Sequence, residues 1–186
     1  MRRRHMLHGL LLGPWWLGGV VPRTAWAQAA SLSNLQLSRG DGALLLDFAV
    51  RLQLPRAVED ALQRGVPMYF VASATVRRSR WYWRDARIAR VRRTWRLAFQ
   101  PLTATWRVSL GALSQNHDTL PEALASLSAS AGWPVCELSQ LAPDGDYVEF
   151  AYALDTERLP RPMQIGLPGA SDWVLRVERE LKVPAS

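Results

Sequence analysis

The sequence of 186 residues contains little cysteine, histidine or lysine, and it has no long apolar run. Its single cysteine, Cys136, excludes an intramolecular disulfide framework and a structural zinc site built from thiolates. No apolar stretch reaches the about 18 residues that a membrane-spanning helix requires, which excludes an integral membrane architecture. The remaining composition, 48% hydrophobic and 21% charged residues, is typical of a globular protein.

The first 27 residues have the three parts of a secretory signal peptide. A basic start at Arg2–Arg4 precedes an apolar stretch from Leu10 to Val21, and small residues stand at the expected cleavage site before residue 28. We therefore expect cleavage after Ala27 and a single β-rich domain over residues 28–186 in the periplasm, with no transmembrane segment after cleavage. The arginines match the twin-arginine export pattern only loosely, so the Sec route is favoured.

Cleavage would change the charge balance of the protein. The chain has 23 basic and 16 acidic residues, and the expected signal contains four arginines and no acid. The remaining 159 residues then have 19 basic and 16 acidic side chains, a net charge of +3. With so small a charge and an expected location outside the cytoplasm, we expect no nucleic acid partner.

Most of the chain alternates apolar and polar residues with a period of two, which predicts short strands with one buried face. The predicted strands are 34–37, 43–52, 68–76, 88–99, 106–110, 147–154 and 173–183. Two helices are predicted, one from Pro55 to Gly65 and one from a capping box at Thr119–Glu122 to Gly132. The expected fold is mainly β, an antiparallel β-sandwich-like single domain of about seven strands with two short helices. An α+β fold is the alternative.

Positive charge is concentrated in one part of the chain. Between Arg77 and Arg107 there are ten arginines and one acid, Asp85, with aromatic residues interleaved. Guanidinium groups bind phosphates and carboxylates, and aromatic faces stack on sugars or bases, so this region predicts a surface for an anionic partner. The candidate binding residues are Arg80, Trp81, Tyr82, Trp83, Arg90, Arg92 and Arg96.

A simpler interpretation of the same pattern stays open. Arginines at alternate strand positions also form an ordinary solvated sheet face, because their long stems cover apolar surface. In that case the tryptophans whose side chains point to the other face of the sheet, Trp95 and Trp106, belong to the core.

Residues with catalytic chemistry are few. After cleavage His117 is the one remaining histidine, and with Cys136 it cannot assemble a histidine-rich or cysteine-rich metal site. The sequence has neither a glycine-rich phosphate loop nor a G-x-S-x-G nucleophile motif. We predict no catalytic residue, no metal and no cofactor. A pair of carboxylates for glycoside hydrolysis stays open, because such a pair is formed in space rather than in sequence.

Several short motifs, taken in order, resemble a known protein family. They are Leu62–Phe70, Arg80-Trp81-Tyr82-Trp83 with Asp85, Thr119–Leu124, Trp133-Pro134-Val135, Leu154–Thr156 with Leu159–Pro162, and Ser171-Asp172-Trp173. Together they resemble exported proteobacterial proteins of the family called domain of unknown function 4390. The resemblance implies a periplasmic protein without an assigned activity. Because members are often encoded beside a membrane sensor kinase of the nitrogen-regulation type, it also implies an accessory role in such a system.

The expected function is therefore that of an exported, soluble, non-enzymatic binding or accessory protein of the cell envelope. Its expected partner is a membrane sensor kinase, another envelope protein or an anionic envelope component. An envelope hydrolase that acts through carboxylates and a structural envelope protein are the two alternatives.

Overall fold

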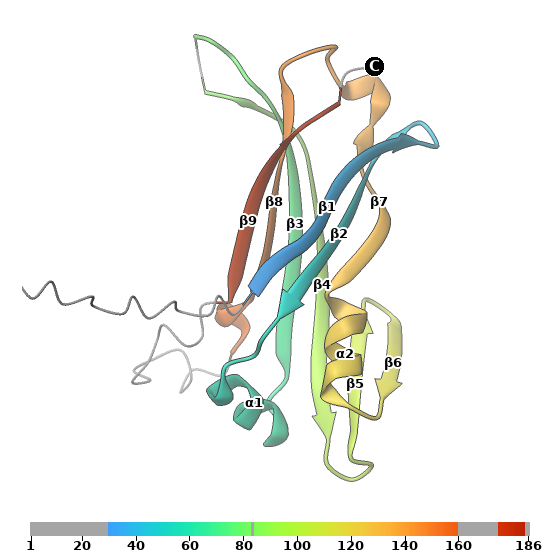
Figure 1. Ribbon diagram of the computed structural model, residues 1–186, viewed down its shortest axis with the longest axis vertical. Coiled ribbons are helices and arrows are strands. Elements are labelled where there is room, and N and C mark those ends of the chain that lie inside the picture. Colours follow the sequence, from blue (N-terminus) through green and yellow to red (C-terminus); the bar gives the residue numbers. More distant parts are fainter. Residues whose placement is uncertain (1–29, 83, 160–174, 185–186) are drawn as a thin grey trace, which may run out of the picture.

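Two antiparallel β-sheets pack face to face in the structure, a computed structural model that describes residues 30–82, 84–159 and 175–184 (Figure 1). The strands are β1 (Ala30–Gly40), β2 (Ala43–Leu52), β3 (Met68–Arg78), β4 (Ala86–Gln100), β5 (Thr105–Leu110), β6 (Leu113–His117), β7 (Ala129–Glu137), β8 (Asp146–Leu154) and β9 (Arg176–Lys182). The smaller sheet has the order β1-β2-β7, and the larger has the order β6-β5-β4-β3-β8-β9. The predicted mainly β, sandwich-like fold is confirmed, with nine strands in the described residues where about seven were predicted.

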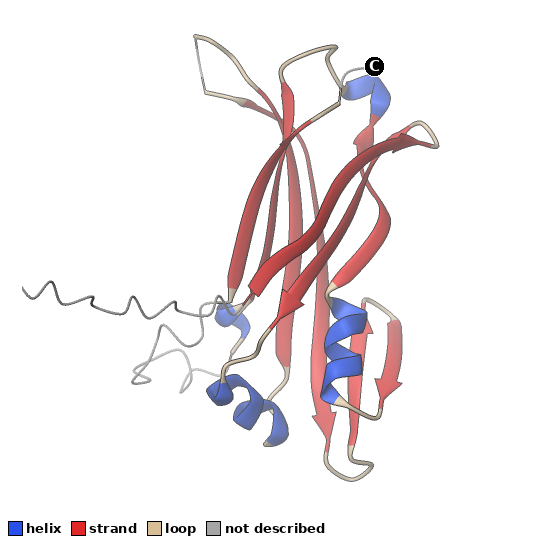
Figure 2. Cartoon of the chain, viewed as in Figure 1, coloured by secondary structure: helices blue, strands red, loops and turns tan. Residues whose placement is uncertain are grey.

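Short helices connect the strands. They are α1 (Arg56–Gln63), α2 (Leu120–Leu127) and two 3-10 turns, η1 (Leu138–Gln140) and η2 (Thr156–Arg158). Both α-helices lie toward one end of the sandwich, the lower end in Figure 2. Within the described part of the chain, no helix is long and apolar enough to cross a bilayer.

Aromatic side chains from both sheets meet in the core. Phe48 of β2 contacts Phe150 and Tyr152 of β8, with ring centroids 5.0 and 6.1 Å apart, and its ring also meets Trp95 of β4 at 6.2 Å. The Tyr152 hydroxyl donates to the Leu127 carbonyl at 3.2 Å, so its one polar atom has a partner. Each fully buried aromatic ring contributes about 2–3 kcal/mol of transfer free energy, so this cluster holds the two sheets together.

Helix α1 begins where the sequence predicted. Pro55 is its N-cap, because a residue without an N–H loses nothing at a helix start. Gly65 follows its end with φ +84°, a conformation that glycine adopts without strain. The stripe Val58, Ala61 and Leu62 is buried, as the spacing predicted.

Helix α2 also begins as predicted but ends earlier. The Thr119 side chain accepts from the Glu122 N–H at 3.4 Å, which is the N-terminal half of a capping box. The predicted end at Gly132 is wrong, because the helix stops at Leu127 and Gly132 lies inside strand β7. There Gly132 has φ +60° and donates its N–H to the Asp47 carboxylate at 2.5 Å. The glycine serves a β-bulge, where the β2–β7 register shifts after Leu46.

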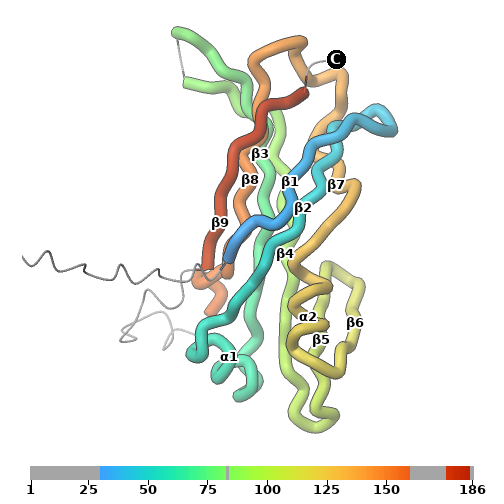
Figure 3. The backbone as a smooth tube through the Cα atoms, viewed as in Figure 1, coloured from blue at the N-terminus to red at the C-terminus, as the bar shows by residue number. Residues whose placement is uncertain are grey.

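Two strands were missed, β6 and β7. Apart from Leu113, β6 consists of polar residues, and it lies at an edge of the larger sheet, so it has no apolar alternation to detect. β7 contains a glycine and a proline, yet it pairs with β2 over most of its length. In Figure 3 the tube of β7 runs beside β2 at the edge of the smaller sheet. Proline is tolerated in such an edge strand because one side of it makes no ladder hydrogen bonds.

Some sequence predictions lie outside the described residues. These are the cleavage site at Ala27, the candidate residue Trp83, the Ser171-Asp172-Trp173 motif and the first residues of the last predicted strand. Within the described residues that strand begins at Arg176 as β9 and pairs with β8.

Candidate functional site

The outer face of the larger sheet carries a column of arginines on β4. Arg90, Arg92 and Arg96 are exposed there, while Trp95 and Leu97 of opposite parity are buried. Register places Arg90 opposite Thr75 and Arg92 opposite Ser73 of β3, and side chains of paired residues share a face. The alternation of arginines and apolar residues in the sequence therefore predicted correctly which side chains of β4 lie on the outer face.

A groove crosses this face between β4 and β9. One depression of about 530 Å³ has Arg87 and Arg90 on one side and Glu178 and Glu180 on the other. A second, of about 260 Å³, continues it and adds Arg92. The two depressions share four lining residues, Ser73, Arg90, Ala151 and Arg176. We call this continuous depression the sheet groove.

The groove is hollow because the strands in its middle carry small side chains. In the middle of the groove, outward positions of β3 are occupied by Ser73 and Thr75 and those of β8 by Ala151 and Ala153, while Arg77 and Glu149 form an ion pair toward one end. The flanking strands carry long charged side chains at their outward positions. Small residues between two rows of long ones leave a channel along the sheet.

The two sides of the sheet groove differ in charge, because arginines line the β4 side whereas the β9 side is mixed, with Arg176 and Arg179 beside its glutamates. The β4 side has Arg87, Arg90 and Arg92, and no carboxylate of the described residues forms an ion pair with them. The β9 side has Glu178, which pairs with Arg176, and Glu180. The β4 guanidinium groups are therefore available to an external anion.

Arg96 lies on the same face but outside the sheet groove. Its register partners are Tyr69 of β3 and Ser109 of β5, and it lines neither depression. The structure thus brings Arg90 and Arg92 together in one groove and leaves Arg96 beyond its end.

The candidate aromatic residues occupy a different place, the turn between β3 and β4. Trp81 is 95% exposed and Tyr82 is 66% exposed, with their ring centroids 5.2 Å apart. Trp95 and Trp106, in contrast, are buried in the core. The single arginine and tryptophan surface expected from the sequence is therefore divided into a groove of arginines and a separate aromatic turn.

Asp85 fixes the base of this turn. Its carboxylate accepts from the backbone N–H of Arg80 at 3.3 Å and from the Tyr147 hydroxyl at 2.5 Å. The hydrogen bond from Tyr147 and that from the Arg80 N–H lower the pKa of Asp85. The same bond, with burial, raises the pKa of Tyr147 to about 12. Tyr147 therefore stays protonated and keeps donating at any ordinary pH.

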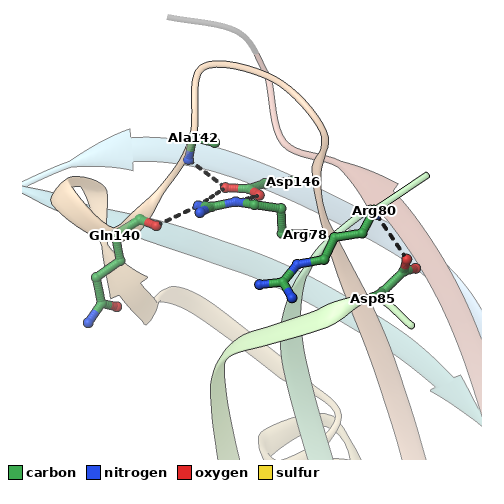
Figure 4. Close-up of polar contacts among 6 residues, drawn as sticks. All are labelled: Arg78, Arg80, Asp85, Gln140, Ala142 and Asp146. Atoms are coloured by element: carbon green, nitrogen blue, oxygen red, sulfur yellow. Dashed lines mark hydrogen bonds and ion pairs between the residues drawn. The ribbon is translucent and has the colours of Figure 1, made fainter. Parts of the chain in front are cut away.

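A buried ion pair that the sequence did not reveal lies next to this turn (Figure 4). Asp146 is 5% exposed, and its two carboxylate oxygens accept from Arg78 Nε at 2.8 Å and Nη2 at 3.1 Å. The backbone N–H of Ala142 donates to the same carboxylate at 2.6 Å, and Arg78 Nη2 also donates to the Gln140 carbonyl at 2.9 Å. The pair ties the loop before β8 to strand β3.

The environment of Asp146 favours its charged form. Burial opposes ionisation, but the hydrogen bonds from Arg78 and from the Ala142 N–H, with the charge of Arg78, outweigh it and lower the pKa of Asp146. The sequence marked residues 144–146 only as a turn. Asp146 and Arg78 become neighbours only because β3 pairs with β8 in a register that places them opposite each other. The sequence alone does not give this register.

Arg93 is a second functional group that sequence reasoning missed. It lies on β4 at a position whose side chain points toward the core, like those of Trp95 and Leu97. Its guanidinium carbon lies 5.0 Å from the centroid of the Trp133 ring. Its Nη1 donates to Ser130 Oγ at 2.5 Å, and burial lowers its pKa. Arg93 therefore joins the larger sheet to β7 of the smaller one and is not part of the outer face.

The described residues offer little catalytic machinery. Asp146 is the one buried charged side chain within residues 30–82, 84–159 and 175–184, so these ranges hold no pair of buried carboxylates. They also hold no group of three metal-ligating side chains. Cys136 lies on β7 and His117 on β6, in different sheets, and burial with the nearby Asp146 charge raises the pKa of the Cys136 thiol. A higher pKa disfavours the thiolate that a cysteine nucleophile requires.

Comparison with known proteins identifies the family. The model of the family described as Domain of unknown function (DUF4390) matches residues 27–181. The chain belongs to this family. The resemblance inferred from the short motifs is thus confirmed at the level of the family, and all of the sheet groove lies within the matched residues. No curated protein and no solved structure matches the chain.

Proposed function

We propose that this member of the DUF4390 family is an exported, non-enzymatic binding protein of the cell envelope. Its sheet groove binds an extended segment of a partner protein in which carboxylates alternate with basic side chains. The observation that carries the proposal is the row of arginines on β4, which face the groove and form no ion pair with a carboxylate within the described residues. A membrane sensor kinase is the partner that the family resemblance implies.

The spacing of these arginines fits an extended chain. Arg90 and Arg92 are two residues apart on a strand, so their Cα atoms are about 7 Å apart. Side chains at alternate positions of an extended peptide have the same spacing. Two carboxylates two residues apart in the partner can therefore meet both guanidinium groups, with charge-assisted hydrogen bonds.

The opposite side of the sheet groove favours a polypeptide over a uniform polyanion. An extended peptide lying in a groove presents alternate side chains to the two sides. Carboxylates on one side would meet the β4 arginines, and basic residues on the other would meet Glu180 and also Glu178, which is shared with Arg176. A polymer with phosphates on both sides would be repelled by those glutamates.

Export is part of the proposal and rests on the sequence. The three-part N-terminal segment supports it, and the family match begins at residue 27, where the expected signal ends. The alternative hydrolase and the structural envelope protein are less well supported. The described residues have no buried pair of carboxylates, and a purely structural role does not account for the groove.

The test is a charge reversal on one side of the sheet groove. Arg90→Glu/Arg92→Glu should lower the affinity for an extended peptide of alternating glutamate and lysine by more than about tenfold, because attraction becomes repulsion at two positions. The same variant should fail to retain the envelope partner in pull-down from a native envelope extract. Circular dichroism should show an unchanged fold, since both side chains are exposed.

The matched control reverses two arginines elsewhere. Arg56→Glu/Arg64→Glu makes the same change in net charge at exposed positions around helix α1. The proposal requires this control to bind like the original protein. Equal loss in both variants would indicate a general charge effect, and unchanged binding by the β4 variant would refute the groove as the binding site.

A further inference from the structure

The turn between β3 and β4 exposes more aromatic surface than any neighbouring part of the described chain. Four large hydrophobic side chains are exposed within the described residues, namely Trp81, Tyr82, Leu102 and Leu113. Two of these four are adjacent in this turn, with exposed arginines on both sides at Arg80 and Arg84. We call Arg80, Trp81, Tyr82 and Arg84 the hairpin tip.

The hairpin tip projects from the body of the protein. In Figure 1 the β3–β4 hairpin, coloured green, extends past the neighbouring strands at the upper end of the sandwich. Leaving a tryptophan almost fully exposed forgoes about 2–3 kcal/mol that its burial would contribute. Folding of this chain alone therefore gives no reason for Trp81 to be at this position.

Hydrogen bonds hold the tip in place. Asp85 bonds the Arg80 N–H and the Tyr147 hydroxyl, and the Ser79 N–H donates to the Gly145 carbonyl at 2.9 Å. These contacts attach both sides of the hairpin to β8 and the loop before it. The aromatic pair is thus presented on a fixed support, not on a free loop.

We propose that the hairpin tip docks into the headgroup region of an anionic membrane surface. Tryptophan and tyrosine prefer the boundary between headgroups and acyl chains, because one part of each ring system is apolar and another is polar. Arginines beside them bind lipid phosphates and are attracted to the negative surface. Because Trp81 and Tyr82 are exposed at a turn, they can enter a deformable lipid surface, whereas hot spots between proteins are enclosed in packed pockets.

The charges around the tip limit how deeply the protein can approach. A depression of about 570 Å³ below the tip is lined by Asp144 and Glu180, with Asp146 already paired to Arg78. An anionic surface repels these carboxylates. The contact is therefore restricted to the tip, and the body of the sandwich stays in water.

Docking at the tip would also place the sheet groove beside the membrane. Arg77 and Arg87 are register partners near the base of this hairpin, and both line the groove. A partner segment bound there would be close to the lipid surface, as expected for the region of a membrane protein next to its spanning helix. This placement depends on the proposed function, but membrane docking by the tip does not.

The experiment is co-sedimentation of the protein, without its expected signal, with two kinds of vesicle. One kind is phosphatidylcholine alone, and the other contains a quarter phosphatidylglycerol. We expect binding to the anionic vesicles only, reduced more than about tenfold by Trp81→Ala/Tyr82→Ala and by Arg80→Glu/Arg84→Glu. Leu102→Ala/Leu113→Ala, which removes equally exposed apolar side chains at other turns, should bind like the original protein.

Three results would overturn the membrane proposal. They are no binding of the original protein to anionic vesicles, equal binding to both kinds of vesicle, and unchanged binding by the two tip variants. Because the peptide assay of the sheet groove contains no lipid, failure of the tip and failure of the groove are measured separately. Unfolding curves of the tip variants should match the original, since all four side chains are exposed.

Discussion

Two ion pairs on neighbouring residues of β3 have different environments. Arg77 pairs with Glu149 at 2.7 Å, and Arg78 pairs with Asp146 at 2.8 Å, so both join β3 to β8 with the same chemistry. The Glu149 side chain is 44% exposed and lies in the sheet groove, whereas that of Asp146 is 1% exposed and holds a loop through its other contacts. One step along a strand thus separates a surface pair from a structural one.

The difference follows from the geometry of the strand. Successive side chains point to opposite faces of a sheet, so consecutive arginines cannot share an environment. On the outer face water competes for the Arg77 and Glu149 charges and weakens their attraction. On the other face the Asp146 carboxylate is shielded from water and depends on its protein partners.

The largest expected effect comes from breaking the buried pair. Asp146→Asn should reduce the free energy of unfolding by about 3 kcal/mol, because Arg78 and the Ala142 N–H lose a charged acceptor. Urea unfolding at neutral pH measures this change. Asp144→Asn, an exposed neighbour in the same turn, is the control and should unfold like the original protein.

Acid should remove the same stabilisation. The folded-state pKa of Asp146 is lowered, so its contribution is fully present above the unfolded value of about 3.9 and is lost as pH falls through the folded value. The difference in stability between the original protein and Asp146→Asn should therefore be constant near neutral pH and shrink below about pH 4. A difference that stays constant into strong acid would show that the carboxylate charge contributes nothing.

A smaller effect is expected at the contact between the sheets. Arg93→Met keeps much of the side-chain length but removes the hydrogen bond to Ser130 and the charge over Trp133, at a cost of about 1–2 kcal/mol. Thermal or urea unfolding checks this value. Arg92→Met makes the same substitution one residue away on the outer face, and it should leave stability almost unchanged. Equal effects of the two substitutions would contradict the assignment of Arg93 to the inner face.

The smallest effect on stability is expected at the exposed pair. Glu149→Gln should leave the unfolding curve within experimental error, since water already solvates both partners. It should instead tighten binding of the peptide of alternating glutamate and lysine on its carboxylate side, because it frees Arg77 and removes one carboxylate from the sheet groove. Measuring both quantities on one variant separates the surface role from a structural one. A large loss of stability would mean that the two pairs of β3 are equivalent after all.

Much of the fold could be predicted from local patterns. Strand β2 has the predicted bounds, Ala43 to Leu52, because its apolar residues alternate without interruption. The two helix starts were correct because proline at Pro55 and a hydroxyl at Thr119 satisfy helix ends locally. The failures were β6, which has no apolar alternation, and β7, where alternation is limited to Trp133 and Val135 and is interrupted by Gly132 and Pro134.

The candidate site was predicted only in part. The period of two placed Arg90, Arg92 and Arg96 on an exposed face, but the concentration of charge also grouped them with the aromatic turn, which lies elsewhere, and did not show that Arg96 is outside the groove. The side of the groove that contains Glu178 and Glu180 comes from β9, about 90 residues away along the chain, so no local pattern could have joined it to β4.

By itself the sequence determined which residues alternate, where the helices begin and which face of β4 carries positive charge, because these depend on neighbours a few positions apart. The tertiary structure decided which strands are adjacent, and through that it decided three things. These are the burial of Asp146 against Arg78, the link from Arg93 to Trp133, and the groove with arginines on one side and mixed charges on the other. The physical reason is that alternation fixes the face on which a side chain lies, whereas strand pairing fixes its neighbours, and charge and burial depend on those neighbours.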